Sequence, residues 1–427
     1  MQHTSTLTPA LKQYLIVTGN YWAFTLTDGA LRMLVVLYFH QLGYNPLSIA
    51  MLFLFYEFFG VVTNLLGGWL GARIGLNRTM NIGLFLQIIA LSMLLVPSEW
   101  LLIPWVMAAQ ALSGIAKDLN KMSAKSAIKH LVPDNGNGTS QHTLYKWVAV
   151  LTGSKNALKG VGFFLGGVLL TTLDFTGAIA SMAVMLVLVW LFSITNLKQD
   201  LGKAKNKPRF NQLFSSSKAI NLLSAARLFL FGARDVWFVV ALPVYLATAL
   251  DWEHWTVGSF LALWIIAYGI VQSVAPYITG IKTNSNRTNT TPPDGNSAVF
   301  WASILLLTPV AIALGLTFAT DSSTTITAGI LIIGLGLFGI AFAVNSSLHS
   351  YLIVSYARHD GVSLDIGFYY MANAMGRLIG TLLSGWLFQA YGLVTCLWVS
   401  ALFIAIAGGV SLLLPKNDDA RSRAASH

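Results

Sequence analysis

Lysine recurs at every fourth position near the end of one apolar stretch of the sequence. The segment GIAKDLNKMSAKSAIKH, residues 114–130, contains Lys117, Lys121, Lys125 and Lys129. This spacing places the four side chains on one face of a helix. We interpret Lys125 and Lys129 as side chains that reach the water at the helix end. Lys117 lies deeper in the apolar run, and we expect it to line an aqueous path for an anion.

Further charged side chains lie within apolar stretches, and the cations outnumber the anions. An ionisable group inside a membrane costs several kcal/mol unless it is paired or faces water, so each one marks a candidate functional position. The cations are Arg32, Lys117, Lys155, Lys159, Arg227, Arg234 and Arg377, and the anions are Asp28, Glu57, Asp118 and Asp235. Internal pairing cannot neutralise this excess, which favours an anionic ligand.

The arginines predict the class of anion. A guanidinium donates two parallel hydrogen bonds to a phosphate-like oxyanion, whereas an ammonium acts as a point charge. We predict that Arg32 and Arg234 bind one oxyanion. The other predicted substrate-binding residues are Lys117, Lys155, Lys159 and Arg377, with Asn156 and Asn373 as neutral donors. Two alternatives stay open: an ion pair between Asp28 and Arg32, four residues apart, and tight helix packing through the small residues around Arg377.

The four acids are predicted to couple transport to protons or to relay charge. A buried carboxylate titrates according to its desolvation and its neighbouring cations. Glu57 has no evident local partner, so we favour it as a proton carrier. Asp28, Asp118 and Asp235 are predicted to exchange between a proton, a cation and the substrate. His349 is interpreted as a packed polar residue.

The composition predicts a polytopic membrane protein. Of the 427 residues, 55% are hydrophobic and only 10% are charged, whereas soluble domains carry about 25% charged residues. The single cysteine excludes a thiolate metal cluster within one chain, and we expect no cofactor and no metal. The N-terminus lacks the pattern of a cleavable signal, so we expect the first apolar segment to be retained. We attribute the net charge of +10 to basic cytoplasmic loops and not to binding of nucleic acid.

Twelve apolar runs are each long enough to cross a bilayer, and they define an all-α fold. They cover about 14–42, 47–70, 79–97, 100–122, 146–170, 177–196, 219–249, 255–281, 298–318, 326–354, 363–391 and 393–414. Residues 1–196 are predicted to form an N-terminal six-helix half and residues 219–414 a C-terminal one. Residues 197–218 form a basic connector between the halves, and 415–427 a tail.

Lysine and arginine are distributed unequally among the connections between these runs. The connections near 43–46, 97–99, 171–176, 250–254, 319–325 and 391–392 contain neither residue, whereas the alternate connections contain many. By the positive-inside rule both termini are predicted to be cytoplasmic. We expect a multi-pass protein of the cell (inner) membrane.

The two halves repeat each other in sequence. GIAKDLN at 114–120 recurs as GIAFAVN at 339–345, and NAL at 156–158 is echoed by NAM at 373–375. A parallel repeat of six and six helices with a mid-membrane substrate site is typical of the major facilitator superfamily. We therefore predict the pseudo-symmetric major facilitator fold and expect a monomer.

Two short motifs resemble signatures of that superfamily. GGWLGARIGLNR, residues 67–78, resembles its gating loop after the second span, with Gly68, Arg73, Gly75 and Arg78 in place. Ala72 stands where an aspartate is usual, which puts the gating salt bridge of that aspartate in doubt. GFFLGG, residues 162–167, resembles the antiporter motif of the fifth span, with Phe163 in place of proline.

Longer stretches resemble one family within the superfamily. YLIVTGNYWAFTLTDGALRMLVVLYFHQLGYNPL at 14–47, SGIAKDLNKMSAKSAIK at 113–129 and YKWVAVLTGSKNALKGVGFFLGG at 145–167 look like the ArsJ-type organoarsenical efflux permeases. The resemblance runs from about Tyr14 to Leu414. It implies export of 1-arseno-3-phosphoglycerate, which glyceraldehyde-3-phosphate dehydrogenase forms from arsenate. It also implies arsenate resistance and a metabolic, not physical, partnership with that dehydrogenase.

Two other function classes were weighed against this one. A carrier of ordinary organic phosphates, exchanging a phosphate ester for phosphate, would use the same arginines. A membrane enzyme or sensor is disfavoured because no H-E-x-x-H, G-x-S-x-G or phosphate-binding glycine loop occurs.

Overall fold

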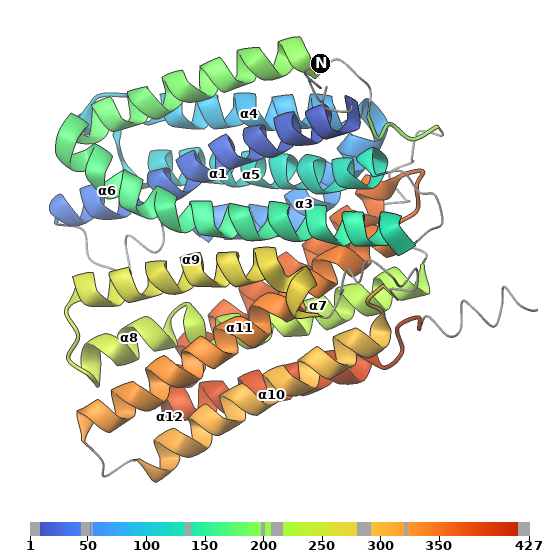
Figure 1. Cartoon of the computed structure of the whole chain (residues 1–427). Coiled ribbons are helices and arrows are strands. Elements are labelled where there is room, and N and C mark those ends of the chain that lie inside the picture. Colours follow the sequence, from blue (N-terminus) through green and yellow to red (C-terminus); the bar gives the residue numbers. More distant parts are fainter. Residues whose placement is uncertain are drawn as a thin grey trace, which may run out of the picture. The chain divides into compact units, whose positions relative to one another are not determined.

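The protein is built from long helices connected by short segments (Figure 1). The structure, a computed structural model, describes residues 9–43, 52, 54–132, 138–197, 201–205, 217–279, 292–319 and 323–416. Regular structure in these ranges is helical. The helices are α1 (Pro9–Gln41), α3 (Leu54–Ile74), α4 (Leu76–Met93), η1 (Ser98–Trp100), α5 (Ile103–Leu131), α6 (Gly138–Asn196), α7 (Lys218–Phe238), α8 (Ala241–Thr248), α9 (His254–Ile278), α10 (Gly295–Phe318), α11 (Thr324–Tyr356) and α12 (Val362–Ser411).

Two of these helices are long enough for two membrane crossings each. α6 has 59 residues and is broken at Asp174, where φ is 55°. α12 has 50 residues and is broken at Gly392, where φ is 82°. A positive φ is incompatible with a continuing right-handed helix, so each break separates two spans. The breaks lie in the predicted connections 171–176 and 391–392.

The span predicted at 219–249 corresponds to one apolar membrane span, Lys218–Thr248, and its helix is interrupted within that span. α7 ends at Phe238 and α8 begins at Ala241. Pro243 explains the break, because a proline clashes with the carbonyl four residues earlier, here that of Val239, and donates no hydrogen bond. The Ser384 hydroxyl accepts a hydrogen bond of 3.1 Å from the Ala241 N–H and satisfies a donor that the break leaves open.

The chain forms two compact units, which we describe separately. Unit 1 comprises Met1–Trp147, Leu158–Phe214 and Ala357–Phe368. α5 is its central helix and packs against α4, α3 and α1; Figure 1 shows α1 and α5 running alongside each other. Gly29 of α1 and Gly162 of α6 meet so closely that a Cβ at Gly29 would lie 2.7 Å from the Lys159 carbonyl oxygen. Small residues therefore bring these helices together.

Unit 2 comprises Val148–Ala157, Ser215–Tyr356 and Tyr369–His427. α11 is its central helix and packs against α10, α9 and α7. An aromatic cluster joins these helices: the Trp237 ring lies 4.8 Å from that of Phe338, edge to face, and Phe338 stacks on Phe342 at 5.6 Å. Such ring pairs stabilise a packed core beyond the area they bury.

The repeated sequence GIAxxxN has the same local structure in both units. Asn120 of α5 donates to the carbonyl of Ala116 at 2.9 Å, and Asn345 of α11 donates to that of Ala341, also at 2.9 Å. Both side chains are buried. The internal repeat found in the sequence thus corresponds to a repeated hydrogen bond within the central helix of each unit.

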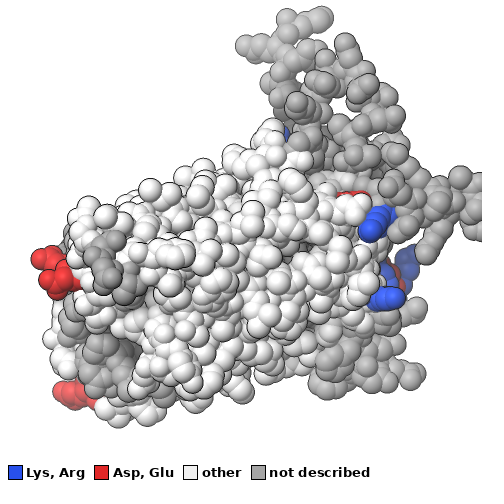
Figure 2. All heavy atoms as spheres, turned by 90° about the horizontal axis from the view of Figure 1, so that it is seen from below, with Lys and Arg blue, Asp and Glu red and all other residues white. Residues whose placement is uncertain are grey.

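The surface is apolar where helices face outward. Large exposed hydrophobic side chains include Leu188, Phe300, Leu307 and Ile333. Figure 2 shows a face whose middle is white, with blue lysine and arginine side chains at one end and only red acidic side chains at the other. Lipid covers such a middle region in a membrane protein, and the unequal ends match the charge bias of its connections.

Candidate functional site

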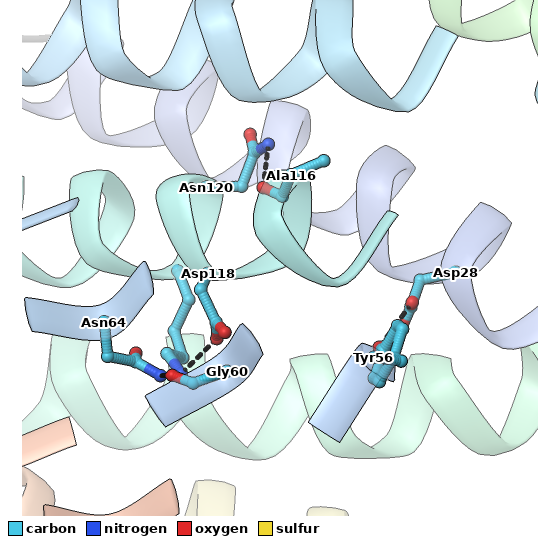
Figure 3. A network of polar contacts seen from close by, with 8 residues as sticks. Asp28, Tyr56, Gly60, Asn64, Ala116, Asp118 and Asn120 are labelled. Carbon is cyan, nitrogen blue, oxygen red and sulfur yellow. Dashed lines mark hydrogen bonds and ion pairs between the residues drawn. The ribbon is translucent and has the colours of Figure 1, made fainter. Parts of the chain in front are cut away.

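Tyr56 of α3 is the centre of a buried charged cluster in unit 1. Its hydroxyl donates a hydrogen bond of 2.6 Å to Asp28 of α1 (Figure 3). The Arg32 guanidinium lies 4.0 Å from the centre of its ring, and the Lys117 ammonium lies 3.7 Å from it. Asp28 and Tyr56 are buried. Three predicted site residues therefore meet at one phenol ring, which attracts both cations through its π face.

The Asp28 carboxylate thus has a different partner from the Arg32 side chain that its spacing suggested. The tyrosine hydroxyl supplies a neutral donor, while the Arg32 guanidinium is held against the ring face. Tyr56 could not be singled out from the sequence, because an aromatic residue in an apolar helix is usually a packing residue.

Asp118 of α5 pairs within its own helix. Its Oδ1 lies 2.6 Å from the Lys121 ammonium, three residues later, while its buried Oδ2 has no hydrogen-bond partner. Figure 3 shows Asp118 beside the hydrogen bond from Asn64 to the Gly60 carbonyl. One oxygen of a buried carboxylate is therefore available to a further donor.

The prediction that the Lys125 side chain reaches water at the end of its helix is wrong. Lys125 is only 3% exposed, and residues 122–128 of α5 are all buried. α5 extends nine residues beyond the predicted span, to Leu131, so its last turns are covered by the rest of unit 1. Lys129 is half-buried.

Asp235 of α7 is shared by two arginines in unit 2. Its Oδ1 lies 2.5 Å from Arg234 Nη2, and its Oδ2 accepts a hydrogen bond of 3.0 Å from Arg377 Nε of α12. Asp235 is fully buried, while Arg234 and Arg377 are 16% and 31% exposed at their side chains. One carboxylate neutralises one charge, so this cluster carries a net charge of +1.

The predicted tight packing of helices around Arg377 is confirmed, while its role in binding substrate stays a prediction. A Cβ at Gly380 would lie 2.7 Å from the Gly232 carbonyl oxygen, and Gly376 lies against the backbone of Leu228. α12 and α7 therefore pack tightly through small residues. This close approach brings Arg377 within hydrogen-bonding distance of Asp235.

Arg227 of α7 is a buried arginine with neutral partners. It is 3% exposed. Its Nε donates to Asn373 Oδ1 at 2.9 Å, and its Nη1 donates to the Ser346 carbonyl at 3.1 Å. The guanidinium also lies 3.8 Å from the centre of the Phe231 ring. Within the described part of the chain, no carboxylate pairs with Arg227.

Arg227 was counted among the buried cations but was not predicted to bind substrate. A signal was present in the sequence: Arg227 precedes Arg234 by seven residues, which places both on one face of a helix. Asn373, which was predicted as a neutral donor to the substrate, is a hydrogen-bond partner of Arg227.

A hydrogen-bonded chain of neutral side chains leads toward Arg227. Asn156 donates to Gln272 of α9 at 2.5 Å, and Gln272 donates to the Ser346 hydroxyl at 2.9 Å. The carbonyl of Ser346 in turn binds Arg227. The predicted neutral donor Asn156 is therefore joined to the arginine through two residues that the sequence did not single out.

The remaining predicted residues are placed as follows. Lys155 lies in unit 2 and Lys159 in unit 1, and both are half-buried on α6. The side chain of Glu57 lies outside the described residues, so its role stays a prediction. His349 is 1% exposed in unit 2, which agrees with a packed polar residue.

The gating-loop motif connects α3 and α4 in unit 1. Gly75 caps α4 with φ at 98°, a value that favours glycine. Gly68 lies against the backbone of Ser363 and Gly367 so closely that a Cβ would meet them. Arg73 stacks over the Trp69 ring at 5.1 Å and is exposed, as is Arg78.

Ala72 takes part in an apolar contact where the superfamily motif has an aspartate. It is fully buried and packs with Ala204 and Leu364. The neighbouring Asp365 is held instead by Arg358, whose Nη2 lies 3.2 Å from it. Hydrophobic packing therefore replaces the salt bridge at this position.

The described part of the connector, residues 201–205, docks on the same loop. The Leu76 N–H donates to the Leu201 carbonyl and the Ala204 N–H to the Ala72 carbonyl, both at 2.8 Å. The Lys205 N–H donates to Asp360 at 3.0 Å. The connector thus bridges the gating loop and the segment before α12.

No group of metal ligands was found among the residues that the structure describes. The clusters instead combine guanidinium, ammonium, amide and phenol groups, which suit an anion. Hydrogen bonds from charged donors to an oxyanion are among the strongest in proteins.

The comparisons with known proteins give the family and the fold. The model described as Major Facilitator Superfamily matches residues 17–336. A search of curated proteins found no match.

Three solved structures illustrate the likeness in fold. One is a bacterial homologue of the iron transporter ferroportin in an outward-facing state, with a TM-score of 0.69 and 14% identity, covering 93% of this chain and 98% of that one. The human organic anion transporter MFSD10 (TETRAN) has a TM-score of 0.72 and 14% identity, covering 95% and 100%. The fucose:proton symporter FucP of E. coli, as a single-substitution variant, has a TM-score of 0.69 and 11% identity, covering 96% and 100%.

These similarities confirm the predicted all-α fold with twelve transmembrane helices, but at such identities they show the fold alone. Among the described residues, seven apolar helices meet the length and hydropathy required of a membrane span, and two of them contain a second crossing. The protein is therefore a multi-pass membrane protein with the fold of small-molecule transporters. Since the family model matches more than half of its length, the chain belongs to the major facilitator superfamily.

Proposed function

We propose that the protein is a secondary active transporter that exports a multivalent organic oxyanion, 1-arseno-3-phosphoglycerate, from the cytoplasm by alternating access. The observation that carries the proposal is the composition of the buried charge in unit 2. Two arginines share Asp235, and Arg227 has only neutral partners. A buried cation without a counter-ion is costly, and a bound anion removes that cost.

The cluster in unit 1 supports the same ligand class. Arg32 and Lys117 approach one phenol ring, and a ring attracts cations less strongly than an oxyanion does. An incoming anion can therefore compete for both. We propose Arg32 and Arg234 as the principal substrate-binding residues, with Lys117, Lys155, Lys159 and Arg377 adding positive charge.

The resemblance to the ArsJ-type permeases is the reason for proposing an arsenic compound as the substrate. Their substrate carries a phosphate at one end and an arsenate at the other, which suits arginine and lysine. A carrier for trivalent arsenic would need several soft thiolates, and this chain has one cysteine. We propose that the protein lies in the inner membrane with both termini cytoplasmic, and that glyceraldehyde-3-phosphate dehydrogenase supplies its substrate.

Transport into everted membrane vesicles tests the proposal. The outside solution contains the dehydrogenase, glyceraldehyde 3-phosphate, its nicotinamide cofactor and arsenate, and the control contains arsenate alone. We expect arsenic to accumulate inside only with the complete mixture. An uncoupler added afterwards should slow accumulation if the carrier exchanges substrate for protons.

A carrier of ordinary organic phosphates is the alternative, because every proposed contact would also accept a phosphate ester. Uptake of labelled 3-phosphoglycerate without arsenic accumulation would favour that alternative. Competition by glycerol phosphate separates the two further.

Two arginine variants test the binding residues. Arg32→Ala and Arg234→Ala should each abolish transport while the protein remains in the membrane. Wild-type transport by both variants would contradict the proposed role of these arginines.

A further inference from the structure

Helix α7 carries two guanidinium groups on one face, separated by one aromatic ring. Arg227, Phe231 and Arg234 are spaced by four and three residues, so their side chains project from the same side of the helix. The Arg227 guanidinium lies 3.8 Å from the centre of the Phe231 ring and that of Arg234 lies 5.0 Å from it. The separation of the two groups therefore cannot exceed the sum of these distances.

Two like charges this close in a buried setting repel each other. Asp235 accepts hydrogen bonds from Arg234 and from Arg377, so its charge is already divided between two cations. Among the described residues no carboxylate pairs with Arg227, and two of the five N–H groups of its guanidinium donate to Asn373 and to the Ser346 carbonyl. The pair on α7 is thus under-neutralised at its Arg227 end.

Unsatisfied polar atoms lie around Arg227. The Tyr369 ring lies 5.3 Å from the guanidinium, and its fully buried hydroxyl has no hydrogen-bond partner among the described residues. Ser224, one turn before Arg227 on α7, is 2% exposed, and in the same part of the chain its hydroxyl also lacks a partner. Buried hydroxyl groups are normally hydrogen-bonded. These two hydroxyl groups could therefore donate to an oxyanion bound by Arg227.

The Arg234 end has a different chemistry. There the donors are two arginines, and the acceptor that holds them is the Asp235 carboxylate. A ligand oxyanion at this end must compete with Asp235, whereas one at the Arg227 end replaces no charge. The two ends therefore form two subsites of unequal character within unit 2.

We infer that α7 binds both ends of a short bis-anionic molecule, with one tetrahedral oxyanion at Arg227, Tyr369 and Ser224, and the other at Arg234 and Arg377. The ligand class is a short molecule with a phosphate-like group at each end, because the two guanidinium groups lie on either side of one ring. This inference rests on the proposed function and adds to it that the carrier recognises two oxyanions at once. Phe231 lies between the subsites, where the uncharged carbon chain would pack.

The predicted selectivity follows from the number of oxyanions. A molecule with one such group can occupy only one subsite. A molecule with two gains a second set of charge-assisted hydrogen bonds, each worth about 1.5–3 kcal/mol, or on the order of tenfold to a hundredfold in affinity.

Binding to purified full-length protein tests this, with inorganic phosphate and propane-1,3-diol bisphosphate as probes in isothermal titration calorimetry. We expect the bisphosphate to bind the wild type at least about tenfold more tightly than phosphate. Arg227→Gln should remove this advantage while changing the affinity for phosphate much less. Arg227→Lys, which keeps the charge, should retain part of it.

Arg358→Gln is the matched control, because it removes a positive charge from an arginine that is 55% exposed and paired with Asp365. It should leave the preference for the bisphosphate intact. Two outcomes would overturn the two-subsite inference: equal affinity of the wild type for both probes, or an equal loss of both affinities in Arg227→Gln. Either outcome would leave the proposed transport of oxyanions standing. Failure of the wild type to bind either probe would overturn both.

Discussion

Single residues in this protein combine packing with charge, and Tyr56 is the clearest case. Its ring contacts two cations and its hydroxyl contacts a carboxylate. The residue thereby connects three helices, because Asp28 and Arg32 lie on α1, Tyr56 itself lies on α3, and Lys117 lies on α5. A tyrosine at this position holds opposite charges near each other, with the carboxylate at its hydroxyl and the cations at its ring.

Tyr56→Phe separates these two roles. The variant keeps the ring but leaves the buried Asp28 carboxylate without its donor, at a cost of about 1.5–3 kcal/mol. We expect a lower melting temperature of the purified protein in a thermal shift assay. Tyr38→Phe is the matched control, since the Tyr38 ring stacks on Phe175 and its hydroxyl makes no hydrogen bond in the described structure. Equal melting temperatures of Tyr56→Phe and the wild type would show that the hydroxyl contributes nothing.

Asp235→Asn tests how the acid competes with the substrate. Removing the shared carboxylate takes one buried negative charge away from Arg234 and Arg377, which should destabilise the ligand-free protein by about 3–5 kcal/mol. Phosphate binds where the carboxylate was, so added phosphate should raise the melting temperature of the variant more than that of the wild type. A smaller rise in the variant would contradict competition between Asp235 and an anion.

The sequence located the charged residues but not their partners. Asp235, Arg234 and Arg377 could be predicted because ionisable groups in apolar runs are rare. Their sharing of one carboxylate could not, since it depends on the approach of α12 to α7 through Gly376 and Gly380. Lys125 was misjudged for a related reason: its burial depends on how far α5 extends under the rest of unit 1.

At the scale of elements, breaks and contacts in helices decide where the charges lie. Pro243 ends α7 shortly after Arg234 and Asp235, and the interruption is stabilised by Ser384 of α12. Discontinuous helices are common near the binding sites of transporters. The break could have been expected from the proline, but the apolar run around it indicated one uninterrupted span.

The end of α5 meets the connector and the segment before α12. His130, beyond the apolar part of α5, lies with its ring 4.8 Å from that of His359, and its Nε2 is buried without a hydrogen-bond partner. Burial, His359 and Lys129 lower the pKa of His130 to about 4, against the opposing effect of Asp360. His130 is therefore neutral in the folded protein at neutral pH.

This lowered pKa predicts a loss of stability in acid. The unfolded chain binds a proton at His130 near its ordinary pKa of 6.5, whereas the folded protein binds it only near 4. Between these values the unfolded state holds more protons, so stability falls as the pH drops from above 6.5 toward 4. The melting temperature of the wild type should fall more steeply than that of His130→Asn between about pH 7 and pH 5. Parallel slopes would contradict a buried neutral His130.

At the scale of the whole molecule, the twelve-helix fold could be predicted almost entirely from the sequence. Hydropathy gave the spans, and the turns at Asp174 and Gly392 coincide with predicted connections. The internal repeat predicted that Asn120 and Asn345 occupy equivalent positions in the two halves. Topology remains a prediction, because it depends on the side of the membrane on which basic connections are retained.

Cysteine labelling tests that topology with little background. The only native cysteine, Cys396, is fully buried in α12 and should not react with a membrane-impermeant maleimide. Glu99→Cys lies in an exposed connection free of lysine and arginine, and Lys205→Cys lies in the exposed basic connector. We expect the first to be labelled in intact spheroplasts and the second only after the membrane is permeabilised, because basic connections are retained in the cytoplasm. The reverse pattern would place both termini outside, and the proposed export from the cytoplasm would then use the lysines of α5 at its exit instead of its entrance.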